Sequence, residues 1–273
     1  MTRLHLPVCA IALLTLAACA SAPVTQPSDP SYDPKRDLGL QWVKRAAEYH
    51  AITRQVYRTA QTALPAFIND KSWSAMPEQR DAEDLPPAVI LDVDETVVSN
   101  VDFQLTYQRP FANHKLNNWS SNFDAAPIDG VKDFVEAART QGVTVFFVTN
   151  RPCESIATTI DPCPQKTTTI NDIREVGIDV TPEYVMLSGE RPGWDREKLV
   201  RRLVIAEKYR VIMLIGDDYG DFVPCARNKV VAPCTKPATR ASRAKALETY
   251  DKYWGRGWYI LPNPMHGSWT SVR

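Results

Sequence analysis

Three short apolar runs, each followed at once by acidic or polar residues, constrain the fold of this chain more than any other feature. The runs are Ala88–Leu91, Val143–Val148 and Val211–Ile215, and all are rich in Val, Ile or Phe. They are too short for helices, and their continuous apolar character is expected of strands that are buried on both faces of a sheet. A weaker strand candidate is Tyr184–Leu187.

Helical patterns lie between and around these runs. The predicted helices are 130–141, 167–176, 195–209 and a late amphipathic helix over 239–254. The clearest helix precedes the first strand, at 41–64, where apolar residues recur at steps of three and four and Pro65 marks the end. Strands that alternate with helices predict an α/β fold with a doubly wound parallel sheet.

Each main strand ends in polar residues that could bind a ligand or take part in catalysis. They are Asp92 and Asp94 after the first strand, Thr149, Asn150 and Arg151 after the second, and Asp217, Asp218 and Asp221 after the third. Ligands of open α/β sheets bind at the carboxyl ends of the strands, so we expect the three clusters to meet in one crevice. Turn formation would explain acidic residues at one strand end, but it explains three clusters together poorly. Carboxylates without His or Cys favour a hard cation, Mg²⁺.

Several other functions are excluded by the sequence. An EF-hand loop needs Gly at its sixth position, where Val97 stands, and the phosphate-binding, dinucleotide-binding, serine-hydrolase and HExxH zinc motifs do not occur. Lys and Arg number 32 against 32 Asp and Glu, so no overall positive field exists to capture a nucleic acid polymer.

The start of the chain predicts export. Arg3 precedes an apolar run from Leu6 to Ala18, which is too short to span a membrane and is typical of a signal peptide. The run ends in Leu16-Ala17-Ala18-Cys19, which resembles a bacterial lipoprotein signal. We therefore expect removal of residues 1–18 and lipidation of Cys19. The alternative is ordinary Ala-x-Ala cleavage, which would leave Cys19 as a free thiol.

The next segment and the remaining cysteines fit an exported protein. Residues 19–37 are rich in Pro and small polar residues, as in a tether, and 38–273 would form the folded domain. Ala20 directly after Cys19, rather than Asp, favours the outer membrane as the site of the anchor. The cysteines left in the domain are Cys153, Cys163, Cys225 and Cys234. Three pairings are possible; the local bridges 153–163 and 225–234 need the least chain organisation, and free buried thiols are the alternative.

The ordered motifs resemble a known family. Asp92-Val-Asp94-Glu-Thr96, the strand ending in Thr149-Asn150-Arg151, Lys198 and Gly216-Asp217-Asp218-x-x-Asp221 are similar to the four motifs of haloacid dehalogenase (HAD) superfamily phosphatases. The similarity is closer still to class C bacterial acid phosphatases, the outer-membrane lipoprotein 5′-nucleotidase type, and it extends from about residue 38 to 270. The resemblance implies a HAD-like core with a cap inserted at about 96–127.

The resemblance also implies catalytic roles. Asp92 would attack phosphorus to form an aspartyl phosphate, and Asp94 would act as general acid and then general base. Thr149 would hold phosphoryl oxygens, with Asn150 and Arg151 beside it in the substrate-binding set. Lys198 would neutralise the phosphoryl group; spacing alone leaves it equally open that Lys198 is a solvated helix lysine.

Further implications concern the cofactor and the substrate. Mg²⁺ would be bound by Asp92, the Asp94 carbonyl and Asp217, with Asp221 holding a metal-bound water. Trp119 in the cap is the best candidate to stack on a base.

Two positions depart from the family pattern. His266 stands where the family often has a Tyr that contacts the base, and Asp218 stands where it usually has Asn.

The sequence thus predicts a lipid-anchored, Mg²⁺-dependent acid phosphatase in the cell envelope. Its substrates would be small phosphomonoesters, with nucleoside 5′-monophosphates as the first candidates, and its oligomeric state is left open. One alternative is a phosphotransferase that passes the same aspartyl phosphate to an alcohol. Another is a surface lipoprotein that keeps the fold to capture a ligand such as haem or a cofactor fragment.

Overall fold

A computed structural model describes residues 34–106, 112–122, 125–157 and 159–272. The predicted signal peptide, Cys19 and most of the predicted tether lie outside the described residues. The tether was expected to reach residue 37, but helix α1 spans Pro34–Arg45. Proline is well suited to the first turn of a helix because it has no N–H to leave unpaired there, so the folded part begins four residues earlier than we expected.

The centre of the protein is a five-stranded sheet with the order β5-β4-β1-β6-β7, in which all neighbouring strands are parallel. The strands are β1 (Pro87–Leu91), β4 (Thr144–Pro152), β5 (Val185–Ser188), β6 (Arg210–Gly216) and β7 (Trp258–Ile260). The chain builds outward from β1 first on one side and then on the other. The carboxyl end of β1 is therefore the point where the strand order reverses, which is where such sheets bind ligands.

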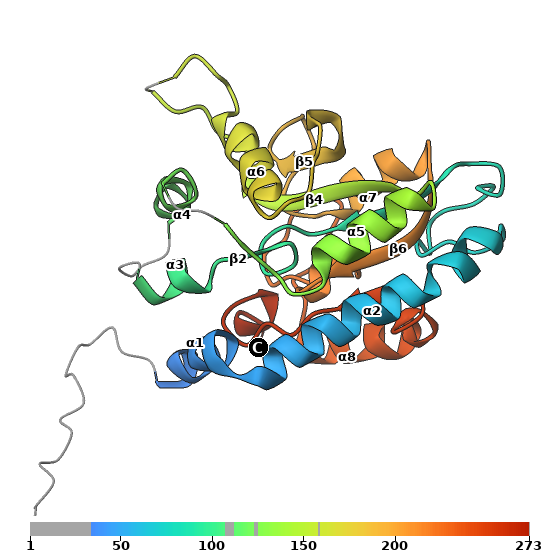
Figure 1. The fold of residues 1–273 in the computed structure, drawn as a ribbon, viewed down its shortest axis with the longest axis horizontal. Helices are drawn as coiled ribbons and strands as arrows, with labels where there is room; N and C mark the ends of the chain where they lie inside the picture. Colours follow the sequence, from blue (N-terminus) through green and yellow to red (C-terminus); the bar gives the residue numbers. More distant parts are fainter. Residues whose placement is uncertain (1–33, 107–111, 123–124, 158, 273) are drawn as a thin grey trace, which may run out of the picture. The chain divides into compact units, whose positions relative to one another are not determined.

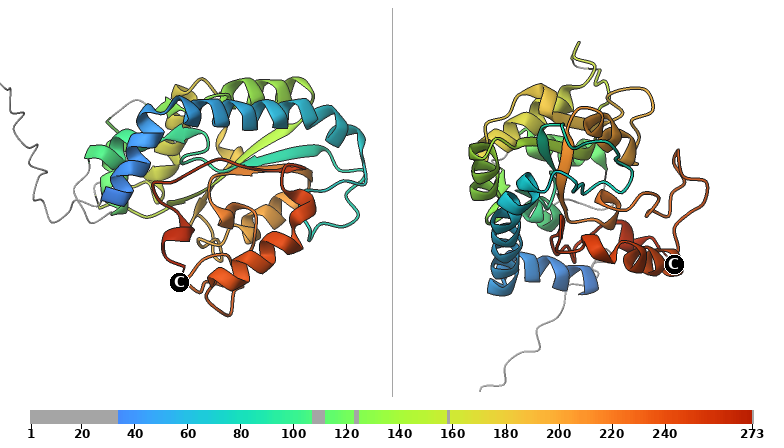
Figure 2. Two further views of the ribbon diagram at one scale, coloured as in Figure 1. Left: turned by 90° about the horizontal axis from the view of Figure 1, so that it is seen from below. Right: turned by 90° about the vertical axis from the view of Figure 1, so that its right-hand side faces the viewer.

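Helices cover both faces of this sheet (Figures 1 and 2). The helices on one face are α2 (Ala47–Asn69), α5 (Val131–Thr140) and α6 (Pro164–Glu175), and those on the other are α7 (Leu199–Ala206) and α8 (Arg240–Thr249). Alternate strand residues feed the two cores: Val89 lies in the first and Ile90 in the second. The predicted doubly wound α/β fold is confirmed, including strands that are buried on both faces.

The helix predicted over 41–64 has both of its ends in the wrong place. The chain is extended at Ala46, so α1 and α2 are separate helices, and α2 continues through Pro65 to Asn69. Proline removes one helical hydrogen bond, but burial of Leu64 and Phe67 on either side of it outweighs that cost. Among the described helices, none is both long and apolar enough to cross a membrane.

The segment expected to form the cap contains a short antiparallel pair and two helices. The elements are β2 (Val98–Ser99), α3 (Val101–Thr106), α4 (Asn113–Ser120) and β3 (Ala126–Pro127). Strands β2 and β3 pair at the base of this segment, while α3 contacts α1 and α4 contacts α6. That this segment acts as a cap stays a prediction.

The connections around the site contain two disulfides and several short turns. Cys153 is bonded to Cys163 and Cys225 to Cys234, which confirms the local pairing. Short 3₁₀ turns lie at Pro182–Tyr184, Tyr219–Asp221, Asp251–Tyr253 and Ser268–Thr270. Helix α7 begins only at Leu199, so Lys198 lies at its N-terminal boundary. The predicted helix began at residue 195 and would have contained Lys198.

Candidate active site

The turn after β1 presents two aspartates to one cavity. The Asp92 N–H donates to the Ile215 carbonyl at 2.9 Å, which fixes the end of β1 against β6. The N–H groups of Val97 and Val98 return to the Val93 carbonyl at 2.7 and 3.0 Å, and this tight turn contains Glu95 in the left-handed region (φ 59°). Asp92 and Asp94 both line a cavity of about 490 Å³ at the carboxyl end of the sheet.

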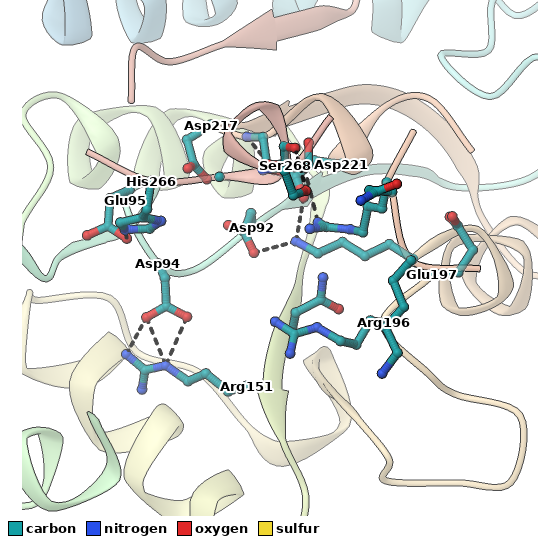
Figure 3. Close-up of a pocket in the computed structure, with 18 of the residues that line it drawn as sticks. Asp92, Asp94, Glu95, Arg151, Arg196, Glu197, Asp217, Asp221, His266 and Ser268 are labelled. Atoms are coloured by element: carbon teal, nitrogen blue, oxygen red, sulfur yellow. Dashed lines mark hydrogen bonds and ion pairs between the residues drawn. The ribbon is translucent and has the colours of Figure 1, made fainter. Parts of the chain in front are cut away.

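Asp94 is held by a buried arginine. Arg151, at the end of β4, donates through Nε and Nη2 to Asp94 Oδ1 at 3.0 and 2.8 Å, and it also pairs with Asp172 of α6. Asn100 Nδ2 donates to Asp94 Oδ1 at 2.9 Å. Burial by itself would raise the pKa of Asp94, but the Arg151 guanidinium outweighs this and holds that pKa below its usual range. Figure 3 shows this contact between Asp94 and Arg151.

Lys198, which immediately precedes α7, forms an ion pair with Asp92. Its ammonium contacts Asp92 Oδ1 and lies 2.8 Å from Asp221 Oδ1, and the residue is 3% exposed. Burial would lower the pKa of Lys198, but the carboxylates of Asp221 and Asp92 together raise it. The ammonium is therefore charged, and Lys198 is not a solvated helix lysine.

Three carboxylates form an all-oxygen group. Asp92, Asp217 and Asp221 each offer a carboxylate oxygen within 4.8 Å of the others. Burial raises the pKa of Asp92 to about 7; Lys198 opposes this rise, and Asp221 and Asp94 add to it. Burial, followed by repulsion from Asp92 and Asp221, raises the pKa of Asp217 well above its usual range. This excess of buried negative charge fits a divalent cation that prefers oxygen ligands.

Gly216, the last residue of β6, makes this grouping possible. A Cβ at this position would lie 2.3 Å from Asp221 Oδ2, so any side chain would displace the Asp221 carboxylate. Asp221 Oδ2 accepts from the Asp218 N–H at 3.0 Å, and Asp217 Oδ2 accepts from Asn263 Nδ2 at 2.7 Å. The loop after β6 therefore fixes the Asp221 carboxylate, and Asn263, in the segment after β7, fixes the Asp217 carboxylate.

Comparison with known proteins assigns this chain to a family. The model of the HAD superfamily, subfamily IIIB (acid phosphatase), matches residues 35–269. The chain belongs to this family. It is therefore a phosphoric monoester hydrolase, an acid phosphatase, as the motifs predicted.

Solved structures show the same fold. The class C acid phosphatase from Bacillus anthracis is 24% identical to this acid phosphatase, with a TM-score of 0.69 over 87% of each chain. The structure of the Bacillus anthracis class C acid phosphatase with tungstate bound gives the same values. The expected resemblance is thus confirmed at the level of fold.

The two departures from the family pattern are both engaged in contacts in this acid phosphatase. Asp218 Oδ1 accepts from the Gly220 N–H at 2.8 Å and lies 3.2 Å from Arg227 Nη2. His266 Nε2 lies 2.9 Å from Glu95 Oε2. Burial would lower the pKa of His266, but Glu95 raises it overall. His266 lines the cavity and is available to contact a substrate there.

The structure brings most of the predicted site residues together. Asn150 and Arg151 line the cavity, whereas Thr149 is fully buried and its hydroxyl donates to Asp94 Oδ2 at 3.3 Å. Trp119 lies against Phe103, with ring centroids 6.0 Å apart, and among the described residues it is Leu116 and Asn113 that line the cavity from α4. A role for Thr149 or Trp119 in substrate binding stays a prediction.

Two positioning residues were missed by sequence reasoning. Arg201 donates to the Thr149 carbonyl and, at 2.7 Å, to Asn150 Oδ1, so it fixes the end of β4. Arg202 donates to the carbonyls of Asp221 and Phe222 and fixes the loop after β6. Both side chains are almost fully buried. The available signal was two arginines three and four residues after Lys198 in an otherwise apolar helix.

Proposed function

We propose that this acid phosphatase hydrolyses small phosphomonoesters, nucleoside 5′-monophosphates in particular, through an aspartyl phosphate on Asp92 and with Mg²⁺ as cofactor. The observation that carries the proposal is the arrangement around Asp92. Lys198 holds one oxygen of its carboxylate, while Asp94 faces the same cavity two residues later. A nucleophile, a proton donor and a buried cation therefore surround one space.

In the first step, a carboxylate oxygen of Asp92 attacks phosphorus and the ester P–O bond breaks. The electron pair of that bond goes to the leaving oxygen, to which Asp94 donates its proton. Arg151 and Asn100 hold the Asp94 carboxyl in place for this transfer. Arg151 holds the pKa of Asp94 below its usual range, so the proton-donating form of Asp94 is populated only at acidic pH, which supports an acidic optimum.

In the second step, water attacks the phosphorus of the aspartyl phosphate. Asp94, now ionised, accepts a proton from this water, the bond from phosphorus to Asp92 breaks, and inorganic phosphate leaves. Lys198 remains beside Asp92 in both steps and balances the negative charge of the phosphoryl group.

The residues that would hold Mg²⁺ are Asp92 and Asp217, with Asp221 nearby, since their carboxylate oxygens lie within 4.8 Å of one another. The family resemblance adds the Asp94 carbonyl as a further ligand. When bound, the ion shields the Asp92 carboxylate from the negative charge of the phosphate. The raised pKa values of Asp92 and Asp217 support a cation here, since without one their charges oppose each other.

The nucleotide preference is supported by the size and lining of the cavity. About 490 Å³ is within the ordinary range of small-molecule sites. Leu116 of α4 and His266 both line it, and the His266 side chain is 40% exposed. These two residues offer apolar and aromatic contacts for a nucleoside.

The test is phosphate release by the full chain in detergent from 5′-AMP and from 4-nitrophenyl phosphate, at about pH 5.5. Release should require Mg²⁺, stop with EDTA and be lost in Asp92→Asn. The matched control is Asp133→Asn, an exposed aspartate on α5. Rapid acid quenching and peptide mass spectrometry should find phosphate on Asp92. Undiminished turnover in Asp92→Asn would refute the nucleophile.

A further inference from the structure

One wall of the active-site cavity is positively charged, and the proposed chemistry does not use it. The residues of this wall are Arg196, Arg227 and Lys229, which we call the cationic wall. Arg196 precedes α7, and the other two belong to the loop closed by the Cys225–Cys234 disulfide. The phosphoryl group at Asp92 already has Lys198 as its cation. The cationic wall is therefore extra positive charge in the same cavity.

Arg196 is available to bind an anion. Its guanidinium points into the cavity from the same segment as Lys198 (Figure 3). It makes no ion pair with any acidic residue in the described ranges. Burial lowers the pKa of Arg196, and the nearby charge of Arg227 lowers it further. Two adjacent cations that repel each other are stabilised when an anion lies between them.

Arg227 is held in position by the acidic residue that departs from the family pattern. Its Nη2 lies 3.2 Å from Asp218 Oδ1. The guanidinium also lies against Gly220, where an added Cβ would come within 3.0 Å of Arg227 Nε. The pairing with Asp218 uses one side of the planar guanidinium, and its other N–H groups remain able to bind a second anion.

The loop that carries Arg227 and Lys229 is fixed to the segment that carries Arg196. The Cys225 N–H donates to Glu197 Oε2 at 2.9 Å, and Glu197 Oε1 accepts from the Leu199 N–H at 3.1 Å. Glu197 is 5% exposed, so this connection is buried. The disulfide and Glu197 together keep the three cations on one side of the cavity.

A second cavity extends the space beyond the cationic wall. It measures about 530 Å³ and shares Asn113, Asn150, Arg196 and Lys229 with the first. A ligand bound at Asp92 therefore has room to continue past Arg196. The shared lining makes Arg196 and Lys229 the residues that such an extension meets first.

We propose that the cationic wall binds a second phosphate group of the substrate, so that the preferred substrates are small molecules with two phosphate groups. This inference rests on the proposed function for the first phosphate. A phosphate monoester dianion matches a wall of several cations, and the planar guanidinium binds phosphate oxygens in pairs. The cationic wall would thus favour phosphomonoesters that carry a second negative group away from the reacting phosphorus.

The test separates binding from turnover. The affinity of full-length Asp92→Asn for adenosine 3′,5′-bisphosphate and for 5′-AMP is measured by calorimetry, with and without the added change Arg196→Ala. We expect the bisphosphate to bind at least about tenfold more tightly, and Arg196→Ala to remove most of that preference. Lys229→Ala is the second variant, and Lys71→Ala, which removes an exposed cation outside the cavity, is the control.

The outcomes are distinct. Equal affinity of Asp92→Asn for the two nucleotides, or equal weakening of both by Arg196→Ala and Lys229→Ala, would overturn the second phosphate site. Turnover of wild type is measured separately on both nucleotides. If wild type released phosphate from neither nucleotide, the proposed function would be refuted. The binding measurement would still decide the role of the cationic wall.

Discussion

At the scale of single residues, the buried charges of Lys198 and Asp92 are each stabilised by the opposite charge beside them. Lys198 contacts the carboxylates of Asp92 and Asp221 and is 3% exposed. Removing one partner of a buried ion pair leaves the other charge unpaired and costs about 3–5 kcal/mol. We expect Lys198→Met to lower the free energy of unfolding by about this amount. Its kcat/KM for 4-nitrophenyl phosphate should fall by about a hundredfold or more. Denaturant unfolding and phosphate release measure the two effects.

The control for this variant is Lys208→Met. Lys208 is exposed just beyond α7, and its replacement should change stability by less than about 0.5 kcal/mol. Similar losses in the two variants would contradict a specific role for Lys198.

The raised pKa of Asp92 predicts how stability depends on pH and metal. Burial raises this pKa to about 7, whereas in the unfolded chain it lies near its ordinary value of 3.8. Between these two values the folded form binds more protons than the unfolded form, so the metal-free protein should lose stability as pH rises through this range. A cation at Asp92 and Asp217 competes with those protons. We expect Mg²⁺ to raise Tm more at about pH 7.5 than at about pH 5.

This prediction is measured by thermal unfolding in EDTA and in excess Mg²⁺, with NaCl at matched ionic strength as the control. A Mg²⁺-induced rise in Tm that is the same at both pH values would argue against coupling between the metal and these carboxylates.

At the scale of elements, the sequence predicted strands better than it predicted the ends of helices. Strands β1, β4, β5 and β6 each contain a continuous apolar run because both faces of the sheet are covered, and each was anticipated. Strand β7 has only three residues at the sheet edge, too few for a pattern, and was missed. The break at Ala46 and the continuation past Pro65 follow from packing against the sheet, which local periodicity does not contain.

The two disulfide loops close similar lengths of chain but hold different side chains. The bonded cysteines are separated by 10 residues in one loop and by 9 in the other, so each disulfide should stabilise the fold by about 2–3 kcal/mol. We expect the double Ser variants at 153/163 and at 225/234 to lose stability by about this amount, measured by denaturant unfolding. The variant at 225/234 should also raise the KM of adenosine 3′,5′-bisphosphate more than that of 5′-AMP, because Arg227 and Lys229 lie in that loop.

The 153/163 variant is the matched control for this effect, since no cation of its loop lines the active-site cavity. A similar change in the ratio of the two KM values in both variants would show that the 225–234 loop has no special part in selecting the substrate.

At the scale of the whole molecule, the convergence of three strand ends was predictable because parallel strands end on one edge. Asp92, Asp94 and Asp217 follow strand ends and line one cavity, as that argument predicted. Lys198 precedes α7 and lines the same cavity, but only the family resemblance had placed it there. The cationic wall was not predictable, since Arg196 and Arg227 meet only through the fold of two loops. Arg201 and Arg202 were also missed as positioning residues, because they bind backbone carbonyls far away in the sequence.

The predicted attachment of the molecule to a membrane rests on residues 1–33, which lie outside the described part. The sequence predicts that residues 1–18 are removed and that Cys19 is acylated, and we propose this as the anchor. The full chain, expressed in a Gram-negative host with an alkyne-labelled fatty acid, should carry the label on its N-terminal peptide and enter the detergent phase. Cys19→Ser should lose the label, whereas Cys9→Ser, changed within the predicted signal peptide, should keep it. Mass spectrometry that finds an unmodified N-terminal Cys19 in wild type would favour ordinary cleavage, and the enzyme would then have no lipid anchor at this residue.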